Sequence, residues 1–131
     1  MLVRDSDSAW LAHVSWNDVQ YINKELCAKR NAFHGPTSDG YDETKERWEA
    51  SYLLVMPLTR AIELCRMSHR RQPFCFYNGN TFVAIIRDVV RPLLRHLEHS
   101  VQDHALNAIG AYVAGTSSRE VLREVIVESL T

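Results

Sequence analysis

The feature that most constrains this chain is a run of apolar residues spaced three and four apart in its second half. The run repeats over about four turns of an α-helix, whereas strict two-residue alternation is nearly absent from the chain. Its members are Phe82, Ile85, Ile86, Val89, Val90, Leu93, Leu94 and Leu97. We therefore predict an all-α fold around a central helix over Phe82–His99, which Pro92 should kink near Asp88 or Val89.

Capping and turn residues divide the first half of the chain into shorter helices. A cap at Ser15 begins a helix over Ser15–Lys29, and the turn-forming stretch Asn31–Tyr41 interrupts the helical pattern. Asp42 is expected to cap a second helix. The apolar face of that helix consists of Trp48, Tyr52 and Val55.

Proline and glycine mark the remaining boundaries. Pro57 lacks a backbone donor, so it should separate the second helix from a third, whose face holds Leu58, Ala61, Ile62 and Cys65. Two further helices are expected over Asp103–Ala114 and Ser117–Leu130. The second should begin with a capping box formed by Ser117 and Glu120.

Composition limits the class of protein. With 131 residues, 46% hydrophobic residues and a net charge of −1, the chain fits one domain over residues 1–131, with residues 1–10 as a flexible start. No apolar run approaches the length of about 20 residues that a membrane helix needs, and the start lacks a secretory signal. The odd set of Cys27, Cys65 and Cys75 favours reduced thiols and a cytoplasmic location. The near-neutral charge argues against a nucleic-acid partner.

The loop before the central helix is the strongest candidate for function. It ends in Asn78, Gly79, Asn80 and Thr81, where a helix start presents unpaired N–H groups that bind anions. Gly79 allows close approach of a ligand, while the other three residues can donate hydrogen bonds to phosphate oxygens. Nearby Arg70 and Arg71 supply positive charge for a phosphate or an acidic partner.

This loop resembles the signature of the Fic/Doc family, His-Pro-Phe-x-(Asp/Glu/Asn)-Gly-Asn-(Lys/Gly)-Arg followed by a central helix. The matching string runs from Gln72 to Phe82, and the segments Val14–Ile22 and Ala111–Leu122 resemble the family's opening and ending. The resemblance implies a helical bundle that binds a nucleotide triphosphate with magnesium, in which Asn78 contacts the metal through the nucleotide. It also implies a toxin–antitoxin, phage or effector setting, with an antitoxin among the possible partners.

The chain departs from that signature at its chemical residues. Gln72 stands in the place of the motif histidine if Pro73-Phe74 is matched, and Phe74 stands there if the spacing from Asn78 is kept. Thr81 and Phe82 replace the basic residues that hold phosphates. Since glutamine is no base near neutral pH, we expect a degenerate or repurposed relative that binds a nucleotide or phosphorylated ligand without the ordinary transfer activity.

Two alternatives remain open from the sequence. The chain could be a non-enzymatic helical interaction module, whose partner meets the aromatic loop or the row formed by Arg87, Arg91 and Arg95. It could instead be a transferase with an atypical base, for which His69 is the candidate.

Overall fold

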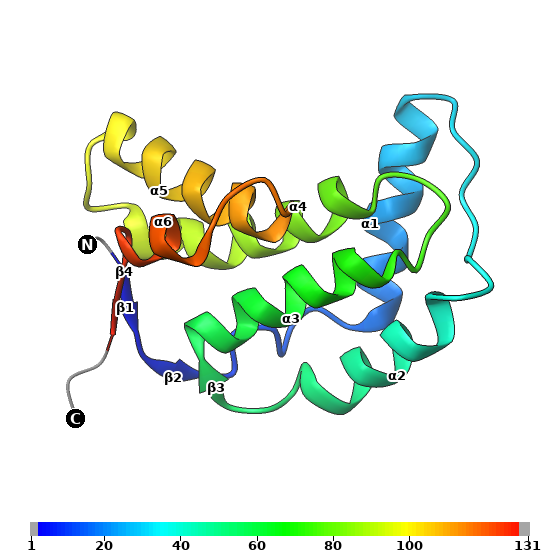
Figure 1. Ribbon diagram of the computed structural model, residues 1–131, viewed down its shortest axis with the longest axis horizontal. Coiled ribbons are helices and arrows are strands. Elements are labelled where there is room, and N and C mark those ends of the chain that lie inside the picture. Colours follow the sequence, from blue (N-terminus) through cyan, green and yellow to red (C-terminus); the bar gives the residue numbers. More distant parts are fainter. Residues whose placement is uncertain (1–2, 129–131) are drawn as a thin grey trace.

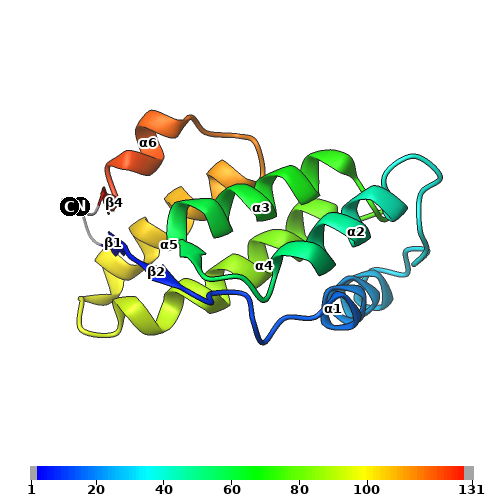
Figure 2. The same cartoon turned by 90° about the horizontal axis from the view of Figure 1, so that it is seen from below.

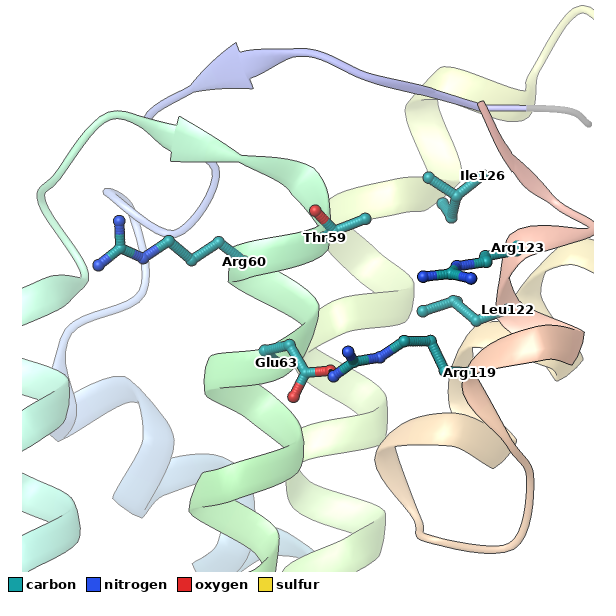
Figure 3. Close-up of a pocket in the computed structure, with 7 residues that line it drawn as sticks. All are labelled: Thr59, Arg60, Glu63, Arg119, Leu122, Arg123 and Ile126. Carbon is teal, nitrogen blue, oxygen red and sulfur yellow. The ribbon is translucent and has the colours of Figure 1, made fainter. Parts of the chain in front are cut away.

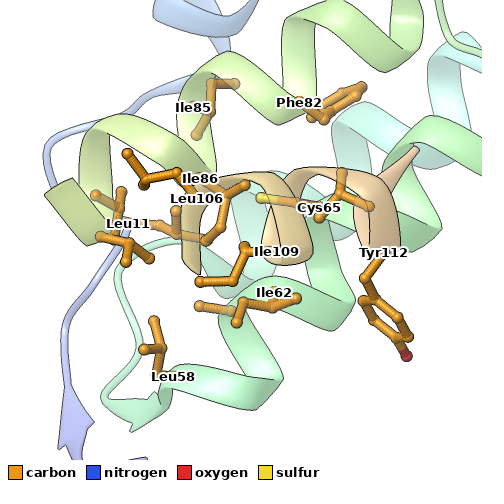
Figure 4. Packing of buried hydrophobic residues seen from close by; sticks show 14 of the residues in the cluster. Leu11, Leu58, Ile62, Cys65, Phe82, Ile85, Ile86, Leu106, Ile109 and Tyr112 are labelled. Atoms are coloured by element: carbon orange, nitrogen blue, oxygen red, sulfur yellow. The ribbon is translucent and has the colours of Figure 1, made fainter. Parts of the chain in front are cut away.

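Three helices form the centre of the molecule and confirm the all-α prediction. The computed structural model describes residues 3–128, in which α3 (Leu58–Arg71), α4 (Asn78–Val90) and α5 (His99–Val113) pack against one another. Figures 1 and 2 show them side by side. Their facing sides supply the core, seen in Figure 4, with Leu58, Ile62 and Cys65 from α3, Phe82, Ile85 and Ile86 from α4, and Leu106, Ile109 and Tyr112 from α5.

Helices α1 (Trp16–Lys29) and α2 (Tyr41–Ser51) complete the helical body at one end. α1 crosses α3 and α4 steeply, so that Figure 2 shows it nearly end-on. The predicted cap of α1 is confirmed: the Ser15 hydroxyl accepts from the Asp18 amide, and the Asp18 carboxylate accepts from the Ser15 amide. The indole of Trp48 on α2 is buried and donates to the Val14 carbonyl.

The start of α2 differs from the prediction. The helix begins at Tyr41 with Gly40 as its N-cap, and Asp42 lies in the first turn and does not cap it. Gly40 is held there because its amide donates to the Thr37 hydroxyl and its carbonyl accepts from the Thr44 hydroxyl. Pro57 does separate α2 from α3, as predicted, and stands immediately before Leu58.

The predicted central helix starts four residues too late, at Phe82, and extends too far, to His99. α4 begins at Asn78, where Tyr77 adopts a left-handed backbone, and it ends at Val90. The chain then continues as the 3-10 helix η1 (Arg91–Leu94), and the expected kink near Asp88 or Val89 stays a prediction. Pro92 has no N–H to donate, and the chain takes the tighter 3-10 geometry at this point. α5 likewise starts earlier than expected, at His99 after the extended residue Glu98.

The two ends of the described chain form short strands that the sequence analysis missed. β1 (Val3–Asp5) pairs in parallel with β4 (Ile126–Glu128), and β2 (Asp7–Ser8) pairs antiparallel with β3 (Met56–Pro57). Residues 3–8, expected to be part of a flexible start, are therefore held in these pairs. The predicted helix over Ser117–Leu130 is reduced to α6 (Arg119–Arg123), whose N-cap is Ser118 and not Ser117, because the chain leaves the helix to form β4. Leu130 lies outside the described residues.

No helix within residues 3–128 is both long enough and apolar enough to cross a membrane. In the same part of the chain Cys27, Cys65 and Cys75 are free thiols, and only Cys75 is exposed.

Candidate anion-binding site

The loop between α3 and α4 is tied to the predicted turn region before α2. The Thr37 amide donates to the Pro73 carbonyl, and the Cys75 amide donates to the Gly35 carbonyl. The loop is bounded by two residues with positive φ, Gln72 at 49° and Tyr77 at 59°. Such a conformation is uncommon outside glycine and requires support from the surrounding contacts, which these hydrogen bonds supply.

Asn78 closes the loop from within. Its Oδ1 accepts from the Phe74 amide at 2.9 Å, and its Nδ2 donates to the Phe74 carbonyl at 2.7 Å. The side chain is buried. Because both polar atoms of this side chain bond to Phe74, the geometry does not favour its predicted contact with phosphate or magnesium, which stays a prediction. The residues around it do not fit a magnesium contact.

Thr81 is also part of the interior and not of a binding surface. Its hydroxyl donates to the Tyr77 carbonyl at 2.7 Å and accepts from the Asn23 amide nitrogen at 3.0 Å. The same nitrogen of Asn23 donates to the Phe76 carbonyl, while Asn23 Oδ1 lies 2.8 Å from Nδ1 of His34. This buried network joins α1 and the loop before α2 to the first turn of α4. It fixes the position of the helix start.

The backbone at the start of α4 keeps its donors available. Among residues 3–128 the amides of Asn78, Gly79 and Asn80 donate no hydrogen bond, and the first helical bond in this turn is made by the Thr81 amide. Asn80 is exposed and Gly79 partly so. Because both Asn78 and Thr81 turn their side chains inward, the N-terminal amides and their partial positive charge stay free for an anion.

A groove begins at Gly79 and Asn80 and runs between α4 and α5. It has a volume of about 400 Å³ and is lined by Gly79 and Asn80 at one end and by Arg87 and Asn107 at the other. Small residues of α5, Gly110 and Ala111, form its other side together with Ala114, which follows the helix. Gly110, in the middle of α5, is a sequence signal that another element packs closely against this helix, and the helical pattern alone does not use it.

Arg87 is the charged residue of this groove. Its Nη2 donates to Asn107 Oδ1 at 3.0 Å, whereas its buried Nε has no hydrogen-bond partner. The guanidinium lies against Gly110, since a Cβ built there would be 3.1 Å from Nε. A buried N–H without an acceptor is costly, so a side-chain movement that gives this Nε a ligand oxygen would be favoured. Arg87 was predicted only as part of a row with Arg91 and Arg95, and that row is broken where α4 gives way to η1.

His69 stands beside the same helix start with a defined tautomer. Its Nδ1 lies 2.9 Å from the Val113 carbonyl oxygen, which can only accept, so Nδ1 carries a hydrogen. In the neutral ring Nε2 is therefore unprotonated. That atom is 3.4 Å from the position that a Cβ on Gly79 would occupy. The structure thus places His69 beside Gly79.

The two arginines predicted beside the loop do not join them. Arg71 turns toward α2, where its Nε lies 3.6 Å from a carboxylate oxygen of Glu43. Arg70 is exposed near the end of α3, with no ion pair among the described side chains. Sequence proximity placed both residues at the site, whereas the direction of each side chain on the helix decides where its charge lies.

Comparisons with protein-family models, with curated proteins and with solved structures give no match for this chain. Within residues 3–128, no three His, Cys, Asp or Glu side chains are grouped closely enough to hold a metal ion. The resemblance to the Fic/Doc family stays a prediction from the loop residues.

Proposed function

We propose that the groove at the start of α4 binds the phosphate group of a nucleotide or of another phosphorylated ligand. The observation that carries the proposal is a set of three backbone amides, at Asn78, Gly79 and Asn80, that donate no hydrogen bond among the described residues. Two of these residues, Gly79 and Asn80, line the groove. Helix N-termini of this kind bind phosphates through their N–H groups and dipole. Arg87, farther along the groove, supplies a cation with an unsatisfied N–H.

The proposal describes a repurposed relative of the Fic/Doc family in which the backbone does the binding. The family motif places basic side chains after its Gly-Asn pair, and this chain has Thr81 and Phe82 there, both buried. Arg87, one and a half helical turns later, lies in the same groove and can supply the missing charge. The toxin, phage or effector setting that the resemblance implies belongs to this proposal.

Titration with inorganic phosphate, AMP, ADP and ATP, each with and without Mg²⁺, tests the binding. We expect a rise in melting temperature, since a ligand that binds only the folded state stabilises it by mass action. The amide resonances of Gly79 and Asn80 should shift in a ¹H–¹⁵N NMR spectrum. Arg87→Gln should weaken binding about tenfold, as loss of a charge-assisted hydrogen bond does. Arg95→Gln, an exposed arginine beyond the groove, is the matched control.

Absence of any shift at Gly79 and Asn80 with all four ligands would exclude the proposal. That result would favour the interaction-module alternative. Phe76 is an aromatic residue of the loop that is half exposed. A protein partner that binds the wild-type chain in a pull-down, and no longer binds the Phe76→Ala variant, would then support that alternative.

The position of His69 favours a second function, phosphoryl or nucleotidyl transfer to a hydroxyl. A hydroxyl oxygen attacking the bound phosphorus would release its proton to Nε2 of His69 while the bond from phosphorus to the leaving phosphate oxygen breaks. The free amides would stabilise the charge on the phosphoryl oxygens. His69→Gln keeps a donor for the Val113 carbonyl and removes the base. If wild type transfers a labelled nucleotide to an acceptor and this variant does not, while its nucleotide affinity is retained, the function is supported. Unchanged transfer in the variant would exclude it.

A further inference from the structure

A second cavity lies at the other end of α3, between the first turn of that helix, α6 and β4. Its volume is about 310 Å³, which is at the lower end of the range for small-molecule sites. Thr59 of α3 and His69 of the groove described above are ten residues apart, or about 15 Å along the helix. The two sites are therefore separate, and nothing in the proposed function uses this one.

Three charged side chains and two apolar side chains face this cavity in Figure 3. The guanidinium of Arg123 points into the cavity between Leu122 and Ile126, and that of Arg119 meets the carboxylate of Glu63. Arg60 also borders the cavity, but its side chain points away from the other residues in this view.

Of the arginines that border the cavity, Arg60 and Arg123 form no ion pair with the side chains that the structure describes, and of these two only Arg123 points inward. Arg119 Nη2 lies 3.0 Å from Glu63 Oε1, so these two charges offset each other. Among the side chains that the structure describes, no carboxylate lies within ion-pair distance of Arg123. A single guanidinium presents a fork of donors that matches one carboxylate group.

The cavity walls are held in place by the fold. Glu63 also accepts from the Tyr112 hydroxyl, and Arg66 lies over the Tyr112 ring at 4.3 Å. On the opposite side, the Asp5 carboxylate accepts from the amide and hydroxyl of Thr59, which joins β1 to α3. A preformed site of this kind loses little conformational entropy when a ligand binds.

We propose that this cavity binds a small organic monocarboxylate, with the carboxylate on Arg123 and an apolar group against Leu122 and Ile126. One unpaired cation matches one negative charge. A phosphate dianion would leave a charge uncompensated, and a neutral analogue would leave Arg123 without its partner. Leu122 and Ile126 are almost fully buried, so they offer a small apolar surface that suits a short or flat ligand.

Benzoate and benzamide form the test pair, because they share the ring and differ in charge. By NMR titration of the full chain we expect saturable benzoate binding with a Kd of about 1 mM or tighter, and binding of benzamide at least about tenfold weaker. The shifted resonances should include Leu122 and Ile126. Stronger binding of phenyl phosphate than of benzoate would overturn the assignment to a carboxylate, and absence of benzoate binding would overturn the site.

Three charge variants locate the contact. Arg123→Gln changes an exposed side chain and should weaken benzoate binding about tenfold, while Arg60→Gln, whose guanidinium points away, should leave it unchanged. Glu63→Gln removes the charge that offsets Arg119 and should strengthen binding. Equal benzoate affinity in Arg123→Gln and wild type would contradict the proposal. His69→Gln should not alter benzoate binding, so the two sites can fail independently.

Discussion

The Nδ1 atom of His34 lies 2.8 Å from Oδ1 of Asn23, inside the network that fixes the start of α4. The amide of Asn23 has its orientation set by Nδ2, which donates to Phe76 and Thr81, so Oδ1 faces the imidazole as an acceptor. His34 thus joins the loop before α2 to the start of α4 through Asn23, and its protonation can be measured.

Stability should depend on pH through His34. Burial, and to a smaller extent the charge of Lys24, lower the pKa of His34 below its ordinary value of 6.5. The unfolded chain therefore binds a proton at a higher pH than the folded protein does. The contribution of His34 to stability is fully present above pH 6.5 and is lost as the pH falls from there through the lower folded pKa.

Urea unfolding at a series of pH values, compared between wild type and His34→Gln, measures this effect. Glutamine can still donate to Asn23, and it does not titrate. We expect the free energy of unfolding of wild type to fall more steeply below pH 6.5 than that of the variant. Parallel curves for the two proteins would show that His34 is not the group responsible.

Asn78 should behave as a structural residue. Asn78→Ala leaves the amide and carbonyl of Phe74 without partners in a buried setting, and should lower the free energy of unfolding by about 2–4 kcal/mol. The exposed neighbour variant Asn80→Ala should change it by less than about 0.5 kcal/mol. Chemical denaturation of both variants tests the contrast, and similar values for the two would contradict the role given to Asn78.

The sequence predicted the helices better than the direction of their polar side chains. The apolar stripe from Phe82 to Leu94 identified the core face of α4 and η1, because residues that a helix buries on one side recur every three to four positions. It could not identify the first turn, since Asn78 and Thr81 are polar residues buried by hydrogen bonds to Phe74 and Asn23. Phe74 is local to Asn78, but it is paired with it only because the loop bends back, and Asn23 lies 58 residues from Thr81 along the chain.

The ends of the chain were mispredicted for a related reason. Ser117 to Leu130 has a helical pattern, yet residues after Arg123 leave the helix to pair with β1 from the opposite end of the sequence. Pairing of this kind depends on tertiary contacts that override local propensity. Similarly, Arg71 and Arg87 could not be assigned to sites from spacing alone, because α2 attracts the first and Gly110 makes room for the second.

Gly40 should be irreplaceable at the start of α2. A Cβ there would lie 1.9 Å from the carbonyl oxygen of Arg71 and 2.8 Å from that of Gln72, both backbone atoms that cannot move aside. Gly40→Ala should therefore lower the free energy of unfolding by about 2 kcal/mol or more. Gly35→Ala is the control, since its Cβ would meet only the exposed ring of Phe33, which can rotate away. Calorimetric melting of both variants gives the comparison, and equal melting temperatures would contradict the expected backbone clash.

Asn80→Asp should change stability and anion binding in opposite directions. Asn80 is the third residue of α4, where a negative charge interacts favourably with the helix dipole and raises stability by about 0.3–1 kcal/mol. The same carboxylate would stand beside the free amides and repel a phosphate, so affinity should fall although the fold is more stable. Asn80→Ala, which lacks the charge, separates repulsion from loss of the side-chain amide. Thermal melting with and without inorganic phosphate measures both effects. A phosphate-dependent rise in melting temperature that is as large in Asn80→Asp as in wild type would place the anion elsewhere on the molecule.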